Sequence, residues 1–123
     1  MSAAVNKKLK KARSLLGAKK YQQAFALFSE VLKLSPNQPE ALHHLALFAQ
    51  AQGDHGKAMQ LLSAATQHAP KYHEAHYDLG VMYEKAGNIG KAADHYMAAW
   101  QLSPDMKHYL YGFAKVVEPM RFT

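Results

Sequence analysis

Residues 70–104 read PKYHEAHYDLGVMYEKAGNIGKAADHYMAAWQLSP, and key positions of this stretch recur earlier in the chain at intervals of 34 residues. Prolines recur at this interval, as do alanines and the large apolar residue four positions after each alanine. The recurring positions are Pro36, Pro70 and Pro104; Ala24, Ala58 and Ala92; and Phe28, Leu62 and Tyr96. A fixed period of about 20–50 residues is typical of a solenoid, in which each repeat packs on its neighbours.

Within each period, the residue types predict two helices joined by a tight turn. Small residues such as Ala58 and Gly80 allow two helices to approach closely, while larger residues fill the grooves between them. Proline ends each hairpin because it cannot continue a helix. Gly53 and Gly87 suit the positive φ of a turn inside a hairpin. We expect no strand, and helices near residues 3–17, 21–34, 39–52, 55–68, 73–86, 89–102 and 107–118.

The repeat resembles the tetratricopeptide repeat (TPR), whose signature places a large residue, Leu-Gly, Tyr, Ala-x3-Phe and Pro at fixed offsets. The third repeat matches best, at His76, Leu79-Gly80, Tyr83, Ala92-x3-Tyr96 and Pro104. The first repeat departs from the pattern, with Lys8 and Lys11 where apolar residues are expected. The resemblance implies an all-α fold, a right-handed α-solenoid of antiparallel helix hairpins. It would hold three 34-residue repeats, at about 5–38, 39–72 and 73–106, plus one extra C-terminal helix near 107–118.

Length and composition indicate one folded domain over residues 1–123, of which 49% are hydrophobic. The sequence has no cysteine, which excludes disulfides and thiolate metal sites. No run of about 18 apolar residues predicts a transmembrane segment, and no apolar stretch follows the basic N-terminus as in a secretory signal. We therefore expect a cytoplasmic protein.

Positive charge gathers at the start of the chain. The net charge is +6, but residues 1–33 hold eight basic residues and one acid, whereas the remainder holds seven basic residues and eight acids. This basic stretch is either a solvated surface or a patch for an anionic partner, namely an acidic peptide, an anionic lipid surface or nucleic acid. Nucleic acid is the weakest of these, because no aromatic residue lies among the lysines before Tyr21.

Two short motifs superficially suggest enzyme chemistry. His73-Glu74-Ala75-His76 spaces its histidines by three residues, whereas the zinc-protease motif needs four. The stretches Gly53–Lys57 and Gly87–Lys91 have only two residues between their glycines, and alanine instead of Ser or Thr follows the lysine. We therefore expect no catalytic residue, no metal and no cofactor, and the chain is not predicted to be an enzyme.

The resemblance implies that the first helix of each repeat lines a concave groove that binds a peptide or partner protein. In the family's best-understood members, cations of the third repeat hold a C-terminal carboxylate, but here Glu74 and Asp78 occupy those positions. We therefore expect a ligand that is neutral or basic at the third repeat. The candidate groove residues are Lys10, Arg13, His43, His44, Leu47, Tyr77, Asp78, Val81, His108 and Tyr111.

A protein-interaction scaffold is thus the main functional hypothesis, and two alternatives stay open. In one, the chain is the non-catalytic TPR region of a larger bacterial methyl- or glycosyltransferase, as the family resemblance allows. In the other, it is a self-assembling module that forms a homodimer through its C-terminal helix. That helix is rich in apolar residues on more than one side, at Tyr109, Leu110, Tyr111, Phe113, Val116 and Val117.

Overall fold

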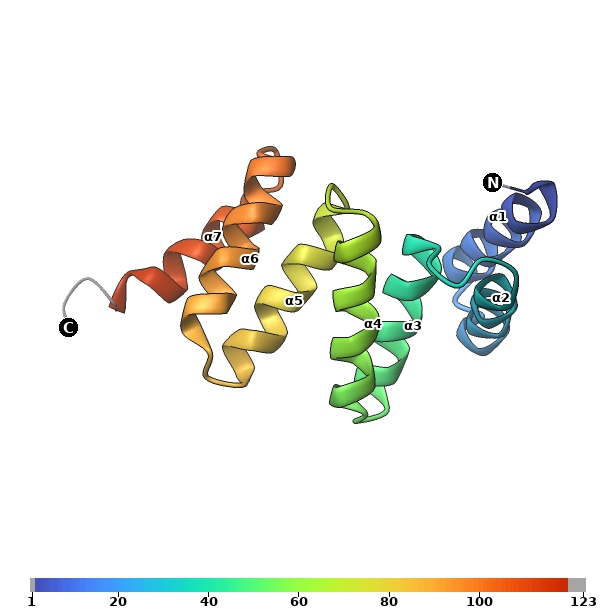
Figure 1. Ribbon diagram of the computed structural model, residues 1–123, viewed down its shortest axis with the longest axis horizontal. Helices are drawn as coiled ribbons and strands as arrows, with labels where there is room; N and C mark the ends of the chain where they lie inside the picture. Colours follow the sequence, from blue (N-terminus) through green and yellow to red (C-terminus); the bar gives the residue numbers. More distant parts are fainter. Residues whose placement is uncertain (1, 120–123) are drawn as a thin grey trace. The chain divides into compact units, whose positions relative to one another are not determined.

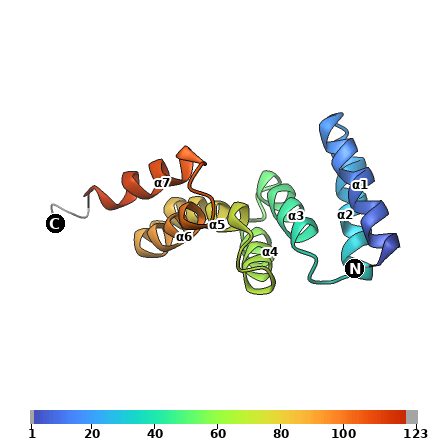
Figure 2. The same cartoon turned by 90° about the horizontal axis from the view of Figure 1, so that it is seen from above.

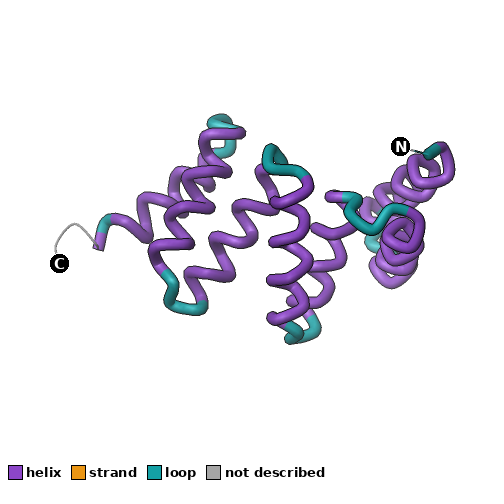
Figure 3. The backbone as a smooth tube through the Cα atoms, viewed as in Figure 1, coloured by secondary structure: helices purple, strands orange, loops and turns teal. Residues whose placement is uncertain are grey.

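The computed structural model describes residues 2–119, which form seven helices and no strand (Figure 1, Figure 3). The expected helices are confirmed, with three C-terminal ends one residue shorter. Within the described range, no helix has the length and apolar character needed to span a membrane. The helices are α1 (Ala3–Gly17), α2 (Tyr21–Leu34), α3 (Pro39–Ala51), α4 (His55–His68), α5 (His73–Lys85), α6 (Ile89–Leu102) and α7 (Lys107–Val117).

The turns inside the hairpins share one backbone conformation. Gly53 has φ 84° and Gly87 has φ 82°, as the sequence predicts. The equivalent position of the first hairpin, 34 residues before Gly53, is Lys19, which has φ 61°. A side chain is strained in this left-handed region, so the first turn is less favourable than the other two.

Helices α1 to α4 belong to the first of two compact units, Met1–His68 (Figure 2). Here α1 packs on α2, α2 on α3, and α3 on α4. One cluster of buried residues joins the first three helices: Val5, Leu9, Ala12, Ala24, Phe28, Val31 and Ala41. This unit therefore contains the first two predicted hairpins.

The second unit, Ala69–Thr123, contains the third hairpin and the extra helix. Helix α6 packs against both α5 and α7, which touch each other much less (Figure 1). Its buried cluster is formed by Ala92, Ala93, Tyr96 and Val116. We describe each unit by itself, and the single domain over residues 1–123 stays a prediction.

Tyr96 fixes the packing of the second unit. Its side chain is only 1% exposed, and its ring lies against the backbone of Gly80 on α5 and Gly112 on α7. A Cβ atom at Gly80 would lie 2.7 Å from Cδ1 of Tyr96, and one at Gly112 would lie 2.9 Å from Cε1. Both distances are shorter than the contacts that Cβ atoms make with other atoms in proteins, so the ring requires glycine on each side.

We expect Gly80→Ala to lower the free energy of unfolding by about 1–3 kcal/mol, because the ring of Tyr96 cannot move away from the new methyl group. Chemical denaturation would measure the loss. Gly90→Ala is the control, since nothing lies within 4 Å of a Cβ there. The loss should shrink in a Tyr96→Leu background, which imitates Ala46 and Leu62 at the equivalent positions of the second repeat. Equal effects of Gly80→Ala in both backgrounds would contradict this packing.

We also expect Lys19→Gly to raise the free energy of unfolding by about 0.5–1 kcal/mol, because glycine adopts a positive φ without strain. Lys20→Gly is the matched control, since it removes the same charge from the same turn at a residue with φ −91°. A gain in stability from the Lys20 variant as large as that from the Lys19 variant would attribute the effect to charge and not to backbone strain.

Candidate functional site

In the second unit, α5 and α7 line a cavity of about 320 Å³. Each of these two helices is the first helix of its repeat. Three of the predicted groove residues line it together: Tyr77 and Val81 from α5, and Tyr111 from α7. Tyr111 is 67% exposed, which leaves most of its ring available to a ligand. The remaining lining residues are Glu84, Lys85, Tyr96, Gly112 and Lys115.

A chain of polar contacts organises one side of this cavity. The hydroxyl of Tyr96 donates a 2.6 Å hydrogen bond to Oε1 of Glu84, and Nζ of Lys115 lies 3.2 Å from Oε2 of the same carboxylate. The bond from Tyr96, together with Lys115, lowers the pKa of Glu84. Burial, and then the contact with Glu84, raises the pKa of Tyr96. The cavity therefore holds a carboxylate that stays ionised near neutral pH, with a lysine beside it.

Tyr77 is a packing residue as well as a cavity residue. Its ring centroid lies 5.5 Å from that of Tyr96, 5.0 Å from that of Tyr109 and 4.9 Å from that of His108. Tyr109 is 1% exposed, its hydroxyl lies 2.7 Å from Nδ1 of His73, and burial raises its pKa to about 12. Replacing Tyr77 would therefore disturb the fold, and Tyr111 is the better aromatic probe of ligand contact.

The other predicted residues of this unit, His108 and Asp78, are not among those that line the cavity. His108 is exposed and places its ring edge-on against Tyr77, while Asp78 is half-buried on α5. The carboxylates of Glu74 and Asp78 contribute to the raised pKa of Tyr109, which places negative charge near the aromatic cluster. Above the ring of Tyr111, Nζ of Lys115 lies 5.8 Å from the ring centroid. The surface thus combines exposed aromatic area with charges of both signs.

In the first unit, the predicted residues have different environments. Arg13 donates two hydrogen bonds to Glu40, of 2.7 and 2.6 Å, which tie α1 to α3. His43 is only 5% exposed, so its side chain belongs to the packed interior. The half-buried ring of His44 stacks on Phe28 with centroids 4.7 Å apart. Lys10 is exposed, Leu47 is 36% exposed, and the Arg13 side chain stays 57% exposed although it is paired with Glu40.

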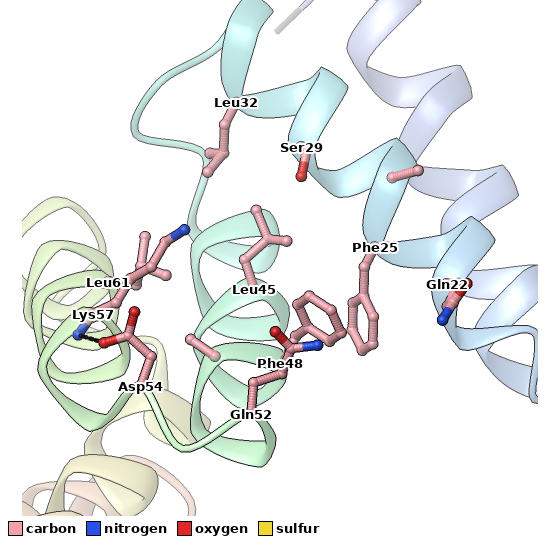
Figure 4. A pocket seen from close by; sticks show the side chains of 12 residues that line it. Gln22, Phe25, Ser29, Leu32, Leu45, Phe48, Gln52, Asp54, Lys57 and Leu61 are labelled. Atoms are coloured by element: carbon pink, nitrogen blue, oxygen red, sulfur yellow. Dashed lines mark hydrogen bonds between the residues drawn. The ribbon is translucent and has the colours of Figure 1, made fainter.

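A second cavity, of about 560 Å³, lies among α2, α3 and α4 and was missed by the sequence reasoning (Figure 4). The rings of Phe25 and Phe48 lie side by side in its wall, with centroids 4.5 Å apart. Asp54 and Lys57 form a polar end, where the Asp54 side chain accepts the Lys57 backbone N–H at 3.2 Å. Phe25 and Phe48 lie outside the recurring positions of the repeat, which is the signal that could have revealed this surface.

Two pairs of histidine rings lie close together in the part of the chain that the structure describes: His43 with His44, and His76 with His95. Nδ1 of His76 lies 3.3 Å from Nδ1 of His95, and Nε2 of His76 lies 2.9 Å from the carbonyl oxygen of Pro70. Burial, followed by the charge of His76, lowers the pKa of His95. Between residues 2 and 119, no group of three or more His, Cys, Asp or Glu side chains is arranged to hold a metal ion.

Three solved structures share this fold. An O-GlcNAc transferase mutant from Thermobaculum terrenum is 25% identical, with a TM-score of 0.80 over 94% of this chain and 22% of that chain. The Yersinia enterocolitica type III secretion chaperone SycD, in complex with a peptide of the translocator YopD, is 17% identical, with a TM-score of 0.77 over 99% of this chain and 95% of that one. The first TPR of Spaghetti (RPAP3), bound to the HSP90 peptide SRMEEVD, is 14% identical, with a TM-score of 0.78 over 95% and 93%.

The sequence itself supports the same relationship. No curated protein matches it. A family model described as tetratricopeptide repeat matches residues 15–76 and 49–105, which together span most of the chain and include all three predicted turns within the hairpins. Seven helices at the expected positions and the 34-residue spacing agree with that match. The chain therefore belongs to the tetratricopeptide repeat family.

Proposed function

We propose that this chain is a protein-interaction module that holds a peptide segment of a partner in the cavity between α5 and α7. The observation that carries the proposal is the combination of an exposed aromatic ring at Tyr111 with the ionised, fixed carboxylate of Glu84 in one cavity. Rigid aromatic rings supply contact area at little cost in conformational entropy. A small number of fixed polar groups then sets the orientation of the ligand.

Two of the similar structures support a peptide ligand. SycD is in complex with a peptide of YopD, and the Spaghetti domain is bound to the HSP90 peptide SRMEEVD. This chain matches each of these proteins over more than nine-tenths of its own length. A shared fold leaves the ligand open, so its chemistry has to come from the side chains of this chain.

The charges on α5 favour a neutral or basic segment. Glu74 and Asp78 lie one helical turn apart, and the Glu74 side chain is 52% exposed. Glu84 adds a third carboxylate farther along the helix, where Lys115 offsets it. An acidic tail such as that of SRMEEVD would meet two carboxylates of like charge at this surface, which disfavours binding. A lysine or arginine in the ligand would instead find an acceptor here.

A second candidate is the non-catalytic TPR region of a larger transferase. The observation in its favour is that the chain matches 22% of the length of an O-GlcNAc transferase at 25% identity. The length of the open reading frame that encodes these 123 residues tests this candidate directly. An open reading frame that continues into a catalytic domain would support it, and one that encodes these residues alone would reject it.

We expect Tyr111→Ala to weaken binding of the peptide by at least about 1 kcal/mol, roughly a fivefold rise in Kd, because it removes the exposed ring. Thermal stability should hardly change, since the ring is 67% exposed. The ligand for this test would be selected from a random peptide library with the wild-type chain, and calorimetry would measure Kd. Gln101→Ala, at an exposed position of α6, is the control.

Charge is tested by Glu74→Lys in the same assay. This change should weaken a basic ligand more than a neutral one, with a difference that shrinks as salt rises. Selected peptides that are predominantly acidic would reject the proposed ligand chemistry. Peptides that bind both Tyr111→Ala and Glu74→Lys as tightly as the wild type would show that the ligand occupies another surface.

A further inference from the structure

Within residues 2–119, no helix covers the side of α7 that is equivalent to a side of α5 covered by α6. On that side of α5, His76 meets His95, Gly80 lies against the ring of Tyr96, and the ring of Tyr83 lies 5.5 Å from that of His95. The residues 34 positions later are Leu110, Ala114 and Val117. Leu110 is 43% exposed, Ala114 is exposed and Val117 is half-buried. Among the described residues this side of α7 stays partly open, and we call the surface that its side chains form the helix seat.

We propose that a second copy of this chain occupies the seat, with its own α7 running antiparallel to the first. The four residues that form the seat are Leu110, Phe113, Ala114 and Val117, and their spacing is symmetrical about the point between Phe113 and Ala114. A twofold axis at that point places Leu110 opposite Val117 of the second copy and Phe113 opposite Ala114 of the second copy. The surface is therefore complementary to itself, as a twofold dimer requires.

The packing inside the chain shows why this arrangement fits. Each hairpin places two antiparallel helices in contact, and a twofold axis across α7 produces the same antiparallel direction. Tyr96 of α6 fills the space that Gly80 leaves on α5. Phe113 of one copy would fill the space that Ala114 leaves on the other in the same way. Phe113 and Val117 pack in part against the buried cluster of Ala92, Ala93, Tyr96 and Val116, and because both are only half-buried, the rest of each side chain is open to this contact.

The charges at the two ends of α7 favour the antiparallel direction. Lys107 begins the helix and Glu118 follows its last residue, and both side chains are exposed. An antiparallel pair brings Lys107 near Glu118 of the second copy at each end, whereas a parallel pair would place like charges together. One pair of helices is a small interface, so the dimer should be weak and should form only at high protein concentration.

Sedimentation equilibrium of the chain over a wide concentration range tests the proposal. We expect the mean mass to rise from the monomer toward twice that value, and Leu110→Asp to keep the mass at the monomer at every concentration. Leu102→Asp is the matched control, because Leu102 is a leucine of similar exposure, 38%, on α6 and is not one of the four seat residues. A wild-type chain that stays monomeric throughout, or a Leu102→Asp variant that dissociates equally, would overturn the proposal.

Cysteine cross-linking tests the direction of the two helices, because the chain contains no cysteine of its own. A mixture of Leu110→Cys and Val117→Cys variants should form the mixed disulfide faster than either disulfide between identical variants. A Leu102→Cys variant sets the background rate of random collision. Fastest coupling between two Leu110→Cys chains would show a parallel pair and overturn the proposed symmetry, as would coupling no faster than the background.

Discussion

The ring of Tyr96, held between the backbones of Gly80 and Gly112, is the contact on which the second unit depends. A buried tyrosine must also satisfy its hydroxyl group, because an unpaired polar group costs about 1–3 kcal/mol inside a protein. Here the ring passes between α5 and α7, and the hydroxyl meets Glu84 at the cavity. A single side chain therefore joins three helices and also lowers the pKa of the carboxylate in the candidate site. Packing and site chemistry cannot be changed separately at this position.

The three repeats solve the same packing problem with different residue pairs. Ala46 and Leu62 of the second repeat correspond to Gly80 and Tyr96 of the third, so a larger side chain on one helix accompanies a smaller one on the other. The first repeat tolerates Lys8 at an apolar position because its amine reaches Glu30, 3.1 Å away. Compensation of this kind lets the fold accept sequences that match the family pattern only in part.

Helix α7 presents two different surfaces, and we propose a separate contact for each. Tyr111 faces the cavity with α5, whereas Leu110 belongs to the seat proposed for a second copy. Adjacent residues of a helix point about 100° apart, so a ligand in the cavity and a helix on the seat need not compete.

The sequence by itself determined the helices and the turns, because these follow from local periodicity and from residues such as Gly53 and Gly87. Only the tertiary structure decided which candidates are buried, paired or open. His43 is buried, Arg13 is tied to Glu40, and Tyr77 is packed among aromatic rings, whereas Tyr111 is open. The position of a residue along a helix sets the direction in which its side chain points around the helix axis. Burial, pairing and pKa depend on neighbours that the chain brings back from a dozen or more residues away, as Tyr96 comes to Glu84.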